Sequence, residues 1–533
     1  MGTYLNPGNS GFARIINSDY IDKTGMIGII NSTIDTTKCL TCISRPRRFG
    51  KSYAAQMLSA YYDKSCDSRA LFENYAISKD ETYEKHLNKY DVIYLDMTQV
   101  TGEAGKESFV DFIKSKITEE IQEAYPSVEI NRDFSSTLIN MVNHNGNKVI
   151  AIIDEWDAPI REIPEKQQEY LRFLRTLFKS SNTTSKIFAA VYMTGILPIK
   201  KDGSQSAISD FREYSVLMPG RFGCYVGFTE DEVKELCNRR GRDFNKMKEW
   251  YDGYTVGKQH SIYNPYSVMQ AVDTGVYTSY WKKTSAAEAL MTYIDMDQDG
   301  LQEDIARLIA GESIIVDTDS FQNDVETFSC KDDVLTLLIH LGYLTYEEVP
   351  DSYDDSDGIM AGFVRIPNEE VRTEFDKLLR RAKHKSLIEL VKKSDKLLKD
   401  TLEGSEEAVA KAIAEVHDSQ YATTFYNNEQ SLRYVVKMAY ISCVDQYAKI
   451  EELPTGHGIA DVAFIPKRNS NLPAMIVELK WNKSGEEAIS QIENRNYQAV
   501  FKGYGGAVVL VGLSYDVETK EHCCRIERKS RGH

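Results

Sequence analysis

The sequence of 533 residues lacks the features that mark several large classes of protein. It has no apolar run long enough to cross a bilayer, and residues 1–18 lack the basic start and apolar middle of a signal peptide. Its nine cysteines are an odd number spread over a long chain, which does not fit a disulfide framework. We therefore expect a protein of the reducing cytoplasm with no membrane partner.

Paired histidines and an excess of positive charge are also missing. The nine histidines show no HExxH motif or paired spacing, so a zinc hydrolase is not supported. The net charge of −16 argues against a basic coat for nucleic acid, because such binding rests on neutralising phosphates. Residues 425–533, however, carry 14 Lys and Arg against 13 Asp and Glu, which permits a local site for DNA or RNA.

The length of the chain predicts about three domains. Residues 1–215 alternate strand-like runs with helical patterns, as an α/β domain does. The pattern turns largely helical over residues 216–400, and we expect a last domain over residues 401–533. Four runs in the first domain are short, apolar and β-branched, as parallel strands buried on both faces are: Cys39–Ser44, Asp91–Asp96, Lys148–Asp154 and Lys186–Thr194.

A candidate phosphate-binding loop follows the first of these strands. The stretch Ser44-Arg-Pro-Arg-Arg-Phe-Gly-Lys-Ser52 would turn backbone N–H groups and a helix N-terminus toward phosphates. Lys51 would add a charge on the β- and γ-phosphates, and Ser52 would offer a hydroxyl to magnesium. The P-loop pattern has a glycine where this chain has Arg45, so the degenerate motif alone also fits a plain surface turn.

A second constellation, Val149–Glu155, is an apolar strand that ends in two acids. In doubly wound folds such acids lie at the edge of the sheet where ligands bind. Asp154 would hold magnesium through water, Glu155 would polarise the attacking water, and Thr194 would sense the γ-phosphate. A strand followed by a solvated acidic turn is the alternative, but both constellations in this order and spacing favour an ATPase. The predicted nucleotide-binding residues are Arg47, Arg48, Phe49, Gly50, Lys51, Ser52, Asp154 and Thr194.

The chain contains several stretches beyond the two constellations, among them YIDKT (20–24), GFTEDEV (227–233) and IYNPYSV (262–268). In these stretches it resembles the predicted AAA-type ATPases of bacteria and archaea, relatives of the signal-transduction ATPases with numerous domains. The resemblance implies a helical lid and winged-helix-like region over residues 216–400 and a PD-(D/E)xK nuclease-like domain at the C-terminus. In that family an arginine-rich loop replaces the first glycine, so Arg45 fits the pattern. The stretches that carry the resemblance are YIDKT (20–24), RPRRFGKS (45–52), IIDEWDAPI (152–160), TGILPIK (194–200), GFTEDEV (227–233), WYDGY (250–254), IYNPYSV (262–268) and IPNEEVR (366–372).

A third constellation lies in the last domain. Two strands joined by the turn-rich KRNSNLP predict a hairpin that places Asp461 roughly opposite Glu478. Like charges in such positions destabilise a sheet unless a positive group lies between them, and a divalent cation is the natural candidate. Period two puts Lys480 on the same face as Glu478, where it could orient a water or stabilise the transition state.

Two further residues fit a nuclease-type site. Glu429 could add a carboxylate to the metal, and Gln491 could hold the water or the phosphate. A solvated hairpin with an ordinary salt bridge between Glu478 and Lys480 is the plain alternative. The match of Asp461, Glu478 and Lys480 to the PD-(D/E)xK pattern favours the nuclease-type site over that alternative.

We therefore expect an α/β protein with a parallel-sheet P-loop ATPase domain, a helical and winged-helix-like middle, and a restriction-endonuclease-like C-terminal domain. ATP and Mg²⁺ are the expected cofactors, with Mn²⁺ as an alternative at the nuclease-like site. The expected function is ATP-gated cleavage of DNA or RNA, and the alternative is a non-catalytic ATP-dependent switch. Arg47 and Arg48 could bind phosphate or ribose, pair with acids of the chain, or act as an arginine finger in a homo-oligomer.

Overall fold

The computed structural model describes most of the chain, and it separates into two compact units. Residues 1–282 and 315–371 form the first unit, and residues 283–314 and 372–533 form the second. The described ranges are 2–104, 108–179, 181–199, 210–281, 300–319, 330–348, 361–381, 385–420, 447–455, 458–466, 472–494 and 507–529, with a few single positions between them, among them 208, 321, 328, 432–433, 435–436 and 439–441.

The N-terminal part of the first unit is built on a five-stranded parallel sheet with the order β2-β3-β4-β1-β5. Nearly every residue of the four long strands is buried, which explains their continuous apolar character. All four strand-like runs of the sequence are confirmed within two residues at their ends. The strands are β1 (Leu40–Ser44), β2 (Asp91–Asp96), β3 (Val149–Asp154), β4 (Phe188–Gly195) and β5 (Arg212–Tyr214).

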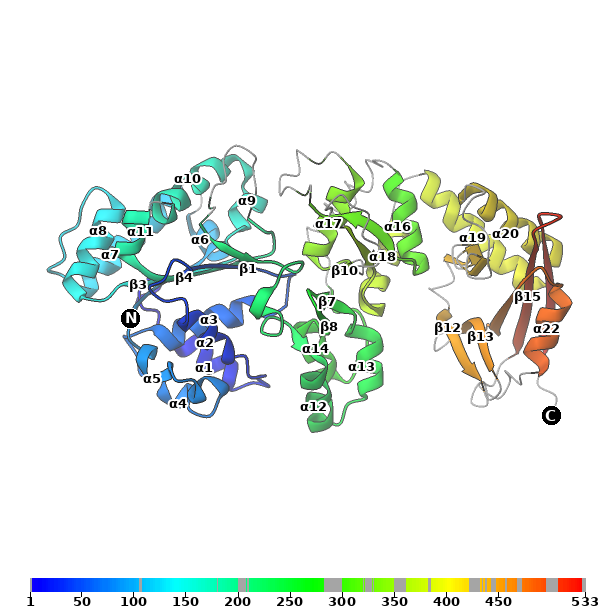
Figure 1. Ribbon diagram of the computed structural model, residues 1–533, viewed down its shortest axis with the longest axis horizontal. Coiled ribbons are helices and arrows are strands. Elements are labelled where there is room, and N and C mark those ends of the chain that lie inside the picture. The colour runs from blue at the N-terminus through cyan, green and yellow to red at the C-terminus, as the bar shows by residue number, and fades with distance from the viewer. Residues whose placement is uncertain are drawn as a thin grey trace. The chain divides into compact units, whose positions relative to one another are not determined.

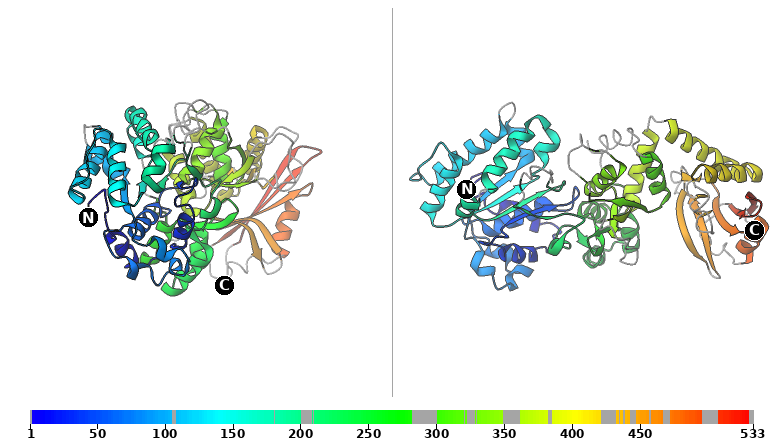
Figure 2. Two further views of the ribbon diagram at one scale, coloured as in Figure 1. Left: turned by 60° about the vertical axis from the view of Figure 1, so that its left-hand side comes forward. Right: turned by 45° about the horizontal axis from the view of Figure 1, so that its top comes forward.

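Helices cover both faces of this sheet, as a doubly wound fold requires (Figure 1). The further views keep the blue N-terminal helices and the cyan helices on opposite sides of the strands (Figure 2). One group comprises α1 (Ser10–Ile16), α2 (Gly25–Asn31), α3 (Lys51–Tyr62), α4 (Arg69–Phe72) and α5 (Tyr83–His86). The other comprises α6 (Met97–Ala104), α7 (Phe109–Ala124), α8 (Phe134–Asn145), α9 (Ala158–Glu162), α10 (Gln167–Phe178) and α11 (Ser181–Ile187).

The rest of the first unit is largely helical, as expected, but it also contains two small sheets. Their strands have two to five residues, too short to show a clear alternation in sequence. The first sheet has the order β6-β8-β7 and the second β10-β11-β9. The elements are β6 (Phe228–Thr229), α12 (Glu230–Arg240), α13 (Phe244–Tyr251), β7 (Tyr254–Val256), β8 (Gln259–Tyr263), α14 (Pro265–Thr274), β9 (Ile314–Asp317), α17 (Lys331–Leu341), β10 (Thr345–Glu348), β11 (Ala361–Arg365) and the start of α18 (Glu369–Arg381).

The second unit contains a five-stranded mixed sheet in the order β12-β13-β14-β15-β16. Only β14 and β15 run parallel, and the other neighbours are antiparallel. The strands are β12 (Tyr447–Thr455), β13 (Gly458–Pro466), β14 (Ala474–Trp481), β15 (Val508–Asp516) and β16 (Glu521–Lys529). The helices include α16 (Leu301–Ala310), α19 (Lys385–Glu403), α20 (Glu406–Gln420) and α22 (Gly485–Asn494), of which α22 packs on β14 and β15.

The eight cysteines within the described ranges are all free thiols. None of the helices formed by the described residues is long and apolar enough to span a membrane.

Candidate functional site

The loop between β1 and α3 has the shape of a phosphate cradle. Arg48 and Gly50 adopt left-handed backbone conformations, with φ of 70° and 90°, and reverse the chain so that α3 begins at Lys51. The Lys51 side chain is buried, and its Nζ donates hydrogen bonds to the carbonyl oxygens of Arg45 (3.1 Å) and Pro46 (3.0 Å). The loop thus folds around the ammonium group of its own lysine.

Arg45 takes a structural position rather than one in the cradle. Its buried guanidinium donates from one nitrogen to the carbonyl oxygens of Ser44 and Tyr214, both at 2.9 Å, and so ties the start of the loop to the end of β5. Burial lowers the pKa of Arg45 to about 10, which leaves the side chain charged at neutral pH. The arginine that replaces the usual glycine therefore braces the loop.

The acids predicted from the second constellation lie at the C-terminal end of β3. Asp154 is buried, and desolvation raises its pKa to about 7, with a hydrogen bond from Ser52 acting in the opposite direction. The register of β2 and β3 also places Asp96 beside Asp154. Asp96 was not predicted as a site residue, although its strand was. Together Asp96, Asp154 and Ser52 offer oxygen donors only, the ligand set that Mg²⁺ prefers, so these residues fit a magnesium ion.

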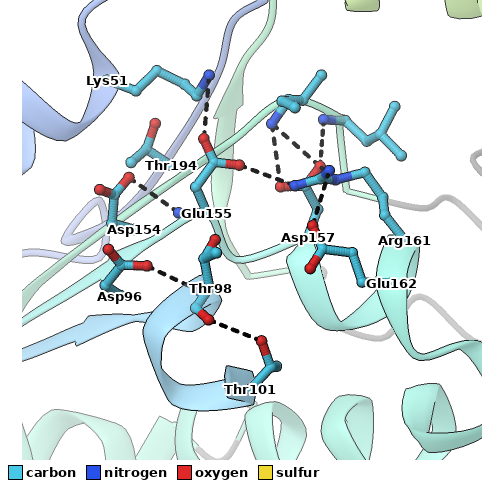
Figure 3. Close-up of polar contacts among 12 residues, drawn as sticks. Lys51, Asp96, Thr98, Thr101, Asp154, Glu155, Asp157, Arg161, Glu162 and Thr194 are labelled. Carbon is cyan, nitrogen blue, oxygen red and sulfur yellow. Dashed lines mark hydrogen bonds and ion pairs between the residues drawn. The ribbon is translucent and has the colours of Figure 1, made fainter. Parts of the chain in front are cut away.

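Glu155 is held between two cations (Figure 3). Its Oε1 lies 3.6 Å from Lys51 Nζ, and its Oε2 lies 3.0 Å from a guanidinium nitrogen of Arg161. The backbone of Glu155 is left-handed, with φ of 51°, in the turn that follows β3. Arg161, on α9, was not predicted as a site residue. No sequence pattern distinguishes it from other arginines on helices.

Asp157 joins this turn to the end of β4. Its buried carboxylate accepts hydrogen bonds from the backbone N–H groups of Ile196 (3.2 Å) and Leu197 (3.0 Å) and from Arg161 Nε (2.9 Å). A Cβ atom on Gly195 would lie 2.5 Å from the Asp157 carboxylate, so this close approach requires glycine. Asp157 lies inside the stretch IIDEWDAPI but had no assigned role.

Thr194 lies beside this network, buried at the end of β4. Its hydroxyl donates to the carbonyl oxygen of Ile43 at 3.0 Å, which joins β4 to β1. In this arrangement Thr194 can only accept a further hydrogen bond. Its role as a sensor of the γ-phosphate therefore stays a prediction.

A cavity of about 430 Å³ opens beside the loop, within the usual size range of small-molecule sites. The Arg48 guanidinium lies 4.4 Å from the ring centre of Tyr266 and donates to the carbonyl oxygen of Tyr280 at 2.7 Å. Phe49 packs edge-on against Tyr254. These contacts tie Arg48 and Phe49 to the middle region. The cavity is lined by parts of residues 15–23, 48–57 and 225–273, and by Glu155.

Arg47 lies near the acids that follow β3. Burial lowers its pKa most, and the positive charge of Arg161 lowers it further, while Glu155 and Glu162 oppose the shift. This environment suits the in-chain roles that were considered for Arg47. The arginine-finger role stays a prediction.

The hairpin of β13 and β14 has the predicted register. The pairs Val462 with Val477 and Ala463 with Ile476 bring Asp461, the residue before Val462, level with Glu478, the residue after Val477, where the ladder ends. Asp461, Glu478 and Lys480 are all buried, and Lys480 Nζ lies 3.5 Å from Glu478 Oε1. The three core residues of the predicted nuclease-type site therefore lie together.

Other contacts at this hairpin were only partly expected. Gln491, on α22, donates from its amide to Glu478, as its predicted place beside the site requires. Arg433 lies 2.7 Å from one oxygen of Asp461, and the backbone N–H of Leu479 donates to the other at 2.9 Å. The pairing of Arg433 with Asp461 was not predicted. The two carboxylates offer the hard oxygen ligands that suit Mg²⁺ or Mn²⁺.

The predicted metal ligand Glu429 lies outside the described residues. Within the described ranges, no group of three or more His, Cys, Asp or Glu side chains is placed to hold a metal ion. The structure therefore brings together two of the three predicted acids, Asp461 and Glu478.

The parallel sheet, the phosphate loop and the acids at the end of β3 define a P-loop domain of the ATPase type. Comparison with known families agrees: residues 7–204 match the model of the predicted AAA-ATPase family. Residues 427–524 match the model of the PD-(D/E)XK nuclease superfamily. Residues 7–204 are therefore similar to the predicted AAA-ATPases and residues 427–524 to the PD-(D/E)XK nucleases, which confirms the resemblance seen in the sequence.

Similar solved structures include the ORC2 protein of Aeropyrum pernix in its ADPNP–ADP complexes, with 13% identity over 69% of this chain and 98% of that chain, and a TM-score of 0.29. The A. pernix ORC1 protein in complex with DNA shares 10% identity over 71% of this chain and 98% of that chain, with a TM-score of 0.28. Scores this low carry no weight for fold or ligand. No functionally curated protein matches the sequence.

Proposed function

We propose that the protein binds and hydrolyses ATP in its N-terminal domain and thereby controls metal-dependent cleavage of nucleic acid by its C-terminal domain. The observation that carries the proposal is the presence of two grouped sets of side chains. Lys51, Asp154 and Glu155 meet at one sheet edge. Asp461, Glu478 and Lys480 meet on the hairpin of the last domain.

In the ATPase domain, Lys51 would exchange its contacts with the loop carbonyls for the β- and γ-phosphates. Ser52 and Asp154 would hold Mg²⁺, which neutralises charge on the phosphates when bound. Glu155, once free of Lys51, would orient the attacking water. Thr194, whose hydroxyl donates to Ile43, would accept a hydrogen bond from the water beside the terminal phosphate.

In the nuclease-like domain, Asp461 and Glu478 would hold a divalent cation, with Glu429 as the third acid. The cation supplies Lewis-acid stabilisation of the phosphate when bound. Lys480 would stabilise the developing charge or orient a water, and Gln491 would keep Glu478 in place. This chemistry does not distinguish DNA from RNA as the substrate.

The test is degradation of labelled DNA and RNA with Mg²⁺ or Mn²⁺, with and without ATP. We expect cleavage by the wild type, no cleavage by Asp461→Asn, and a changed dependence on ATP for Lys51→Ala. Glu527→Gln, an exposed substitution in the same sheet, serves as the control. Absence of metal-dependent cleavage in the wild type under all these conditions would contradict the nuclease assignment.

The second candidate is an ATP-dependent switch whose nuclease fold only binds nucleic acid or a partner. The ion pair between Arg433 and Asp461 favours it, because an arginine already occupies one of the acids that a metal needs. Binding of nucleic acid without cleavage, changed by ATP, is the result that this candidate predicts. The three-domain division, a cytoplasmic location and a homo-oligomeric state belong to the same proposal. A role in defence against mobile elements is also part of it and rests on the domain combination alone.

A further inference from the structure

Arg161 is a residue of the ATPase site that belongs neither to the phosphate loop nor to the two acids at the end of β3. It approaches Glu155 from the side opposite Lys51, so that a single carboxylate separates two cations (Figure 3). The Glu155 side chain is 22% exposed and that of Arg161 is 15% exposed, so this pair lies at the wall of the site rather than in the core. An anion that displaces Glu155 would therefore meet both cations.

The guanidinium of Arg161 is anchored so that one edge stays directed at Glu155. Its Nε donates to Asp157 at 2.9 Å, while the nitrogen that meets Glu155 lies at 3.0 Å. Asp157 is fixed in turn by the backbone N–H groups of Ile196 and Leu197. Arg161 is thus attached to the same sheet edge as Asp154 and Thr194.

The planar guanidinium of an arginine can donate charge-assisted hydrogen bonds to a carboxylate or to a phosphate. A terminal phosphate that draws Lys51 away from Glu155 would compete with the Glu155 carboxylate for the same two cations. The guanidinium of Arg161 needs no large movement to meet it. A diphosphate lacks the γ-phosphate and would bring one charged group fewer to this pair of cations.

Resting on the proposed ATPase function, we infer that Arg161 is a second cationic ligand of the terminal phosphate, supplied by the chain itself, and that it makes the site prefer a nucleoside triphosphate over a diphosphate. In the empty site Glu155 takes the place of that phosphate. Binding of the triphosphate then releases Glu155 for its role with water. Arg161 is thus paired with Glu155 in the empty site and with the terminal phosphate when the triphosphate is bound.

The opposing interpretation is that Arg161 only restrains Glu155. Substitution of Glu155 separates the two, because Glu155→Gln removes the ion pair but leaves the guanidinium. The test measures the dissociation constants of ADP and of the non-hydrolysable analogue ADPNP by calorimetry. It compares Glu155→Gln with the double variant Glu155→Gln, Arg161→Gln.

We expect the ratio of the ADP constant to the ADPNP constant to fall about 10- to 100-fold when Arg161 is removed in the Glu155→Gln background. Arg161→Lys in the same background should retain part of the preference. Arg172→Gln, which removes the same charge from an exposed position on α10, should retain all of it. A ratio that stays within about twofold in the double variant would overturn the inference.

The outcomes also separate this inference from the ATPase assignment. If the wild type binds both nucleotides and Lys51→Ala loses both, the ATPase assignment stands whatever Arg161 does. If the wild type binds neither ADP nor ADPNP, both the assignment and the inference are wrong. Circular dichroism of each variant establishes that the Arg161 substitutions leave the domain folded.

Discussion

In both the ATPase site and the nuclease-like site, acidic side chains form ion pairs with basic side chains of the protein. The basic side chains of the first site attract the expected ligand, whereas that of the second site repels it. Glu155 is paired with Lys51 and Arg161, which an incoming phosphate attracts. Asp461 is paired with Arg433, which an incoming metal ion must repel. Phosphate binding therefore recruits the cations of the first site, whereas metal binding has to displace the cation of the second.

Replacing a basic residue by a neutral one should therefore have opposite effects on ligand affinity in the two sites. Removing a cation from the ATPase site should weaken ligand binding, and removing Arg433 should strengthen it. Burial makes both effects large enough to measure, because interactions among buried charges are screened less by solvent.

The largest effect is expected for Glu155→Gln. ATP hydrolysis should fall about 100-fold or more, because the group that polarises the water is lost. Affinity for ADPNP should be retained or increased, since Lys51 and Arg161 no longer have a competing carboxylate. Turnover and calorimetry measure the two quantities.

Glu162→Gln is the matched control, because Glu162 is a half-exposed acid near the same arginine. Its hydrolysis rate should stay near that of the wild type. Equal losses in both variants would remove Glu155 from the mechanism.

Lys51→Ala should weaken ADP and ADPNP binding about 30- to 1000-fold, since a buried charged partner of the phosphates is removed. Lys116→Ala removes the same charge from an exposed position on α7 and should change neither constant. Calorimetry on the two variants is sufficient. Hydrolysis of ATP by Lys51→Ala at the wild-type rate would show that the phosphate-loop assignment is wrong.

Arg433→Gln should have the opposite sign and increase the affinity for Mn²⁺ about tenfold, because Asp461 loses a competing cation. The measurement is the dependence of the melting temperature on Mn²⁺. It is made in a Lys51→Ala background, where nucleotide cannot bind at the ATP site and bring a metal ion with it. Asp461→Asn should lose the metal-induced increase. If Arg433→Gln binds Mn²⁺ more weakly than its parent, Arg433 stabilises the bound metal and does not compete with it.

Arg525→Gln is the control for that comparison. It removes an equal charge from β16 of the same sheet, where Arg525 pairs with exposed acids. Its affinity for Mn²⁺ should match the parent.

The sequence predicted the frame of each site well and the partners of the acids poorly. The four buried strands and the register of the hairpin follow from local patterns, namely apolar runs and a turn-rich connection. Arg161 and Arg433 were missed because the partner of a long charged side chain depends on packing between distant segments. Asp96 could have been predicted from the sequence, since it ends a predicted strand next to the one that ends in Asp154.

The small strands of residues 216–400 were missed for a different reason. A strand such as β6, with two residues, carries no periodicity, and its pairing with β8 depends on contacts across the fold. The loop position Arg45 was explained from the resemblance alone. The physical reason is that the Arg45 guanidinium donates hydrogen bonds to two carbonyl oxygens, and one of them belongs to Tyr214, which is distant in the sequence.

A last prediction concerns a residue outside both sites, because a change of pH also acts on the rest of the fold. His340, in α17, is buried, and desolvation lowers its pKa to about 4. The stabilisation from keeping it neutral is complete above the unfolded pKa of 6.5 and is lost as the pH falls toward 4. At pH 5 this group alone should cost about 2 kcal/mol.

His340→Leu should remove that part of the acid sensitivity. Thermal unfolding at pH 7 and pH 5 measures it, and the difference between the two melting temperatures should be smaller in the variant. An unchanged difference would mean that His340 is already protonated or exposed in the folded protein. The remaining pH dependence can then be examined at the two sites.

The most direct test of the contrast is a structure of the protein with ADPNP and Mn²⁺ bound. The account predicts that Lys51 and Arg161 meet the terminal phosphate and leave Glu155, while Arg433 moves away from Asp461 as the metal binds between Asp461 and Glu478. It is contradicted if nucleotide is bound while Glu155 still bridges Lys51 and Arg161, or if Mn²⁺ is bound at the hairpin while Arg433 keeps its contact with Asp461.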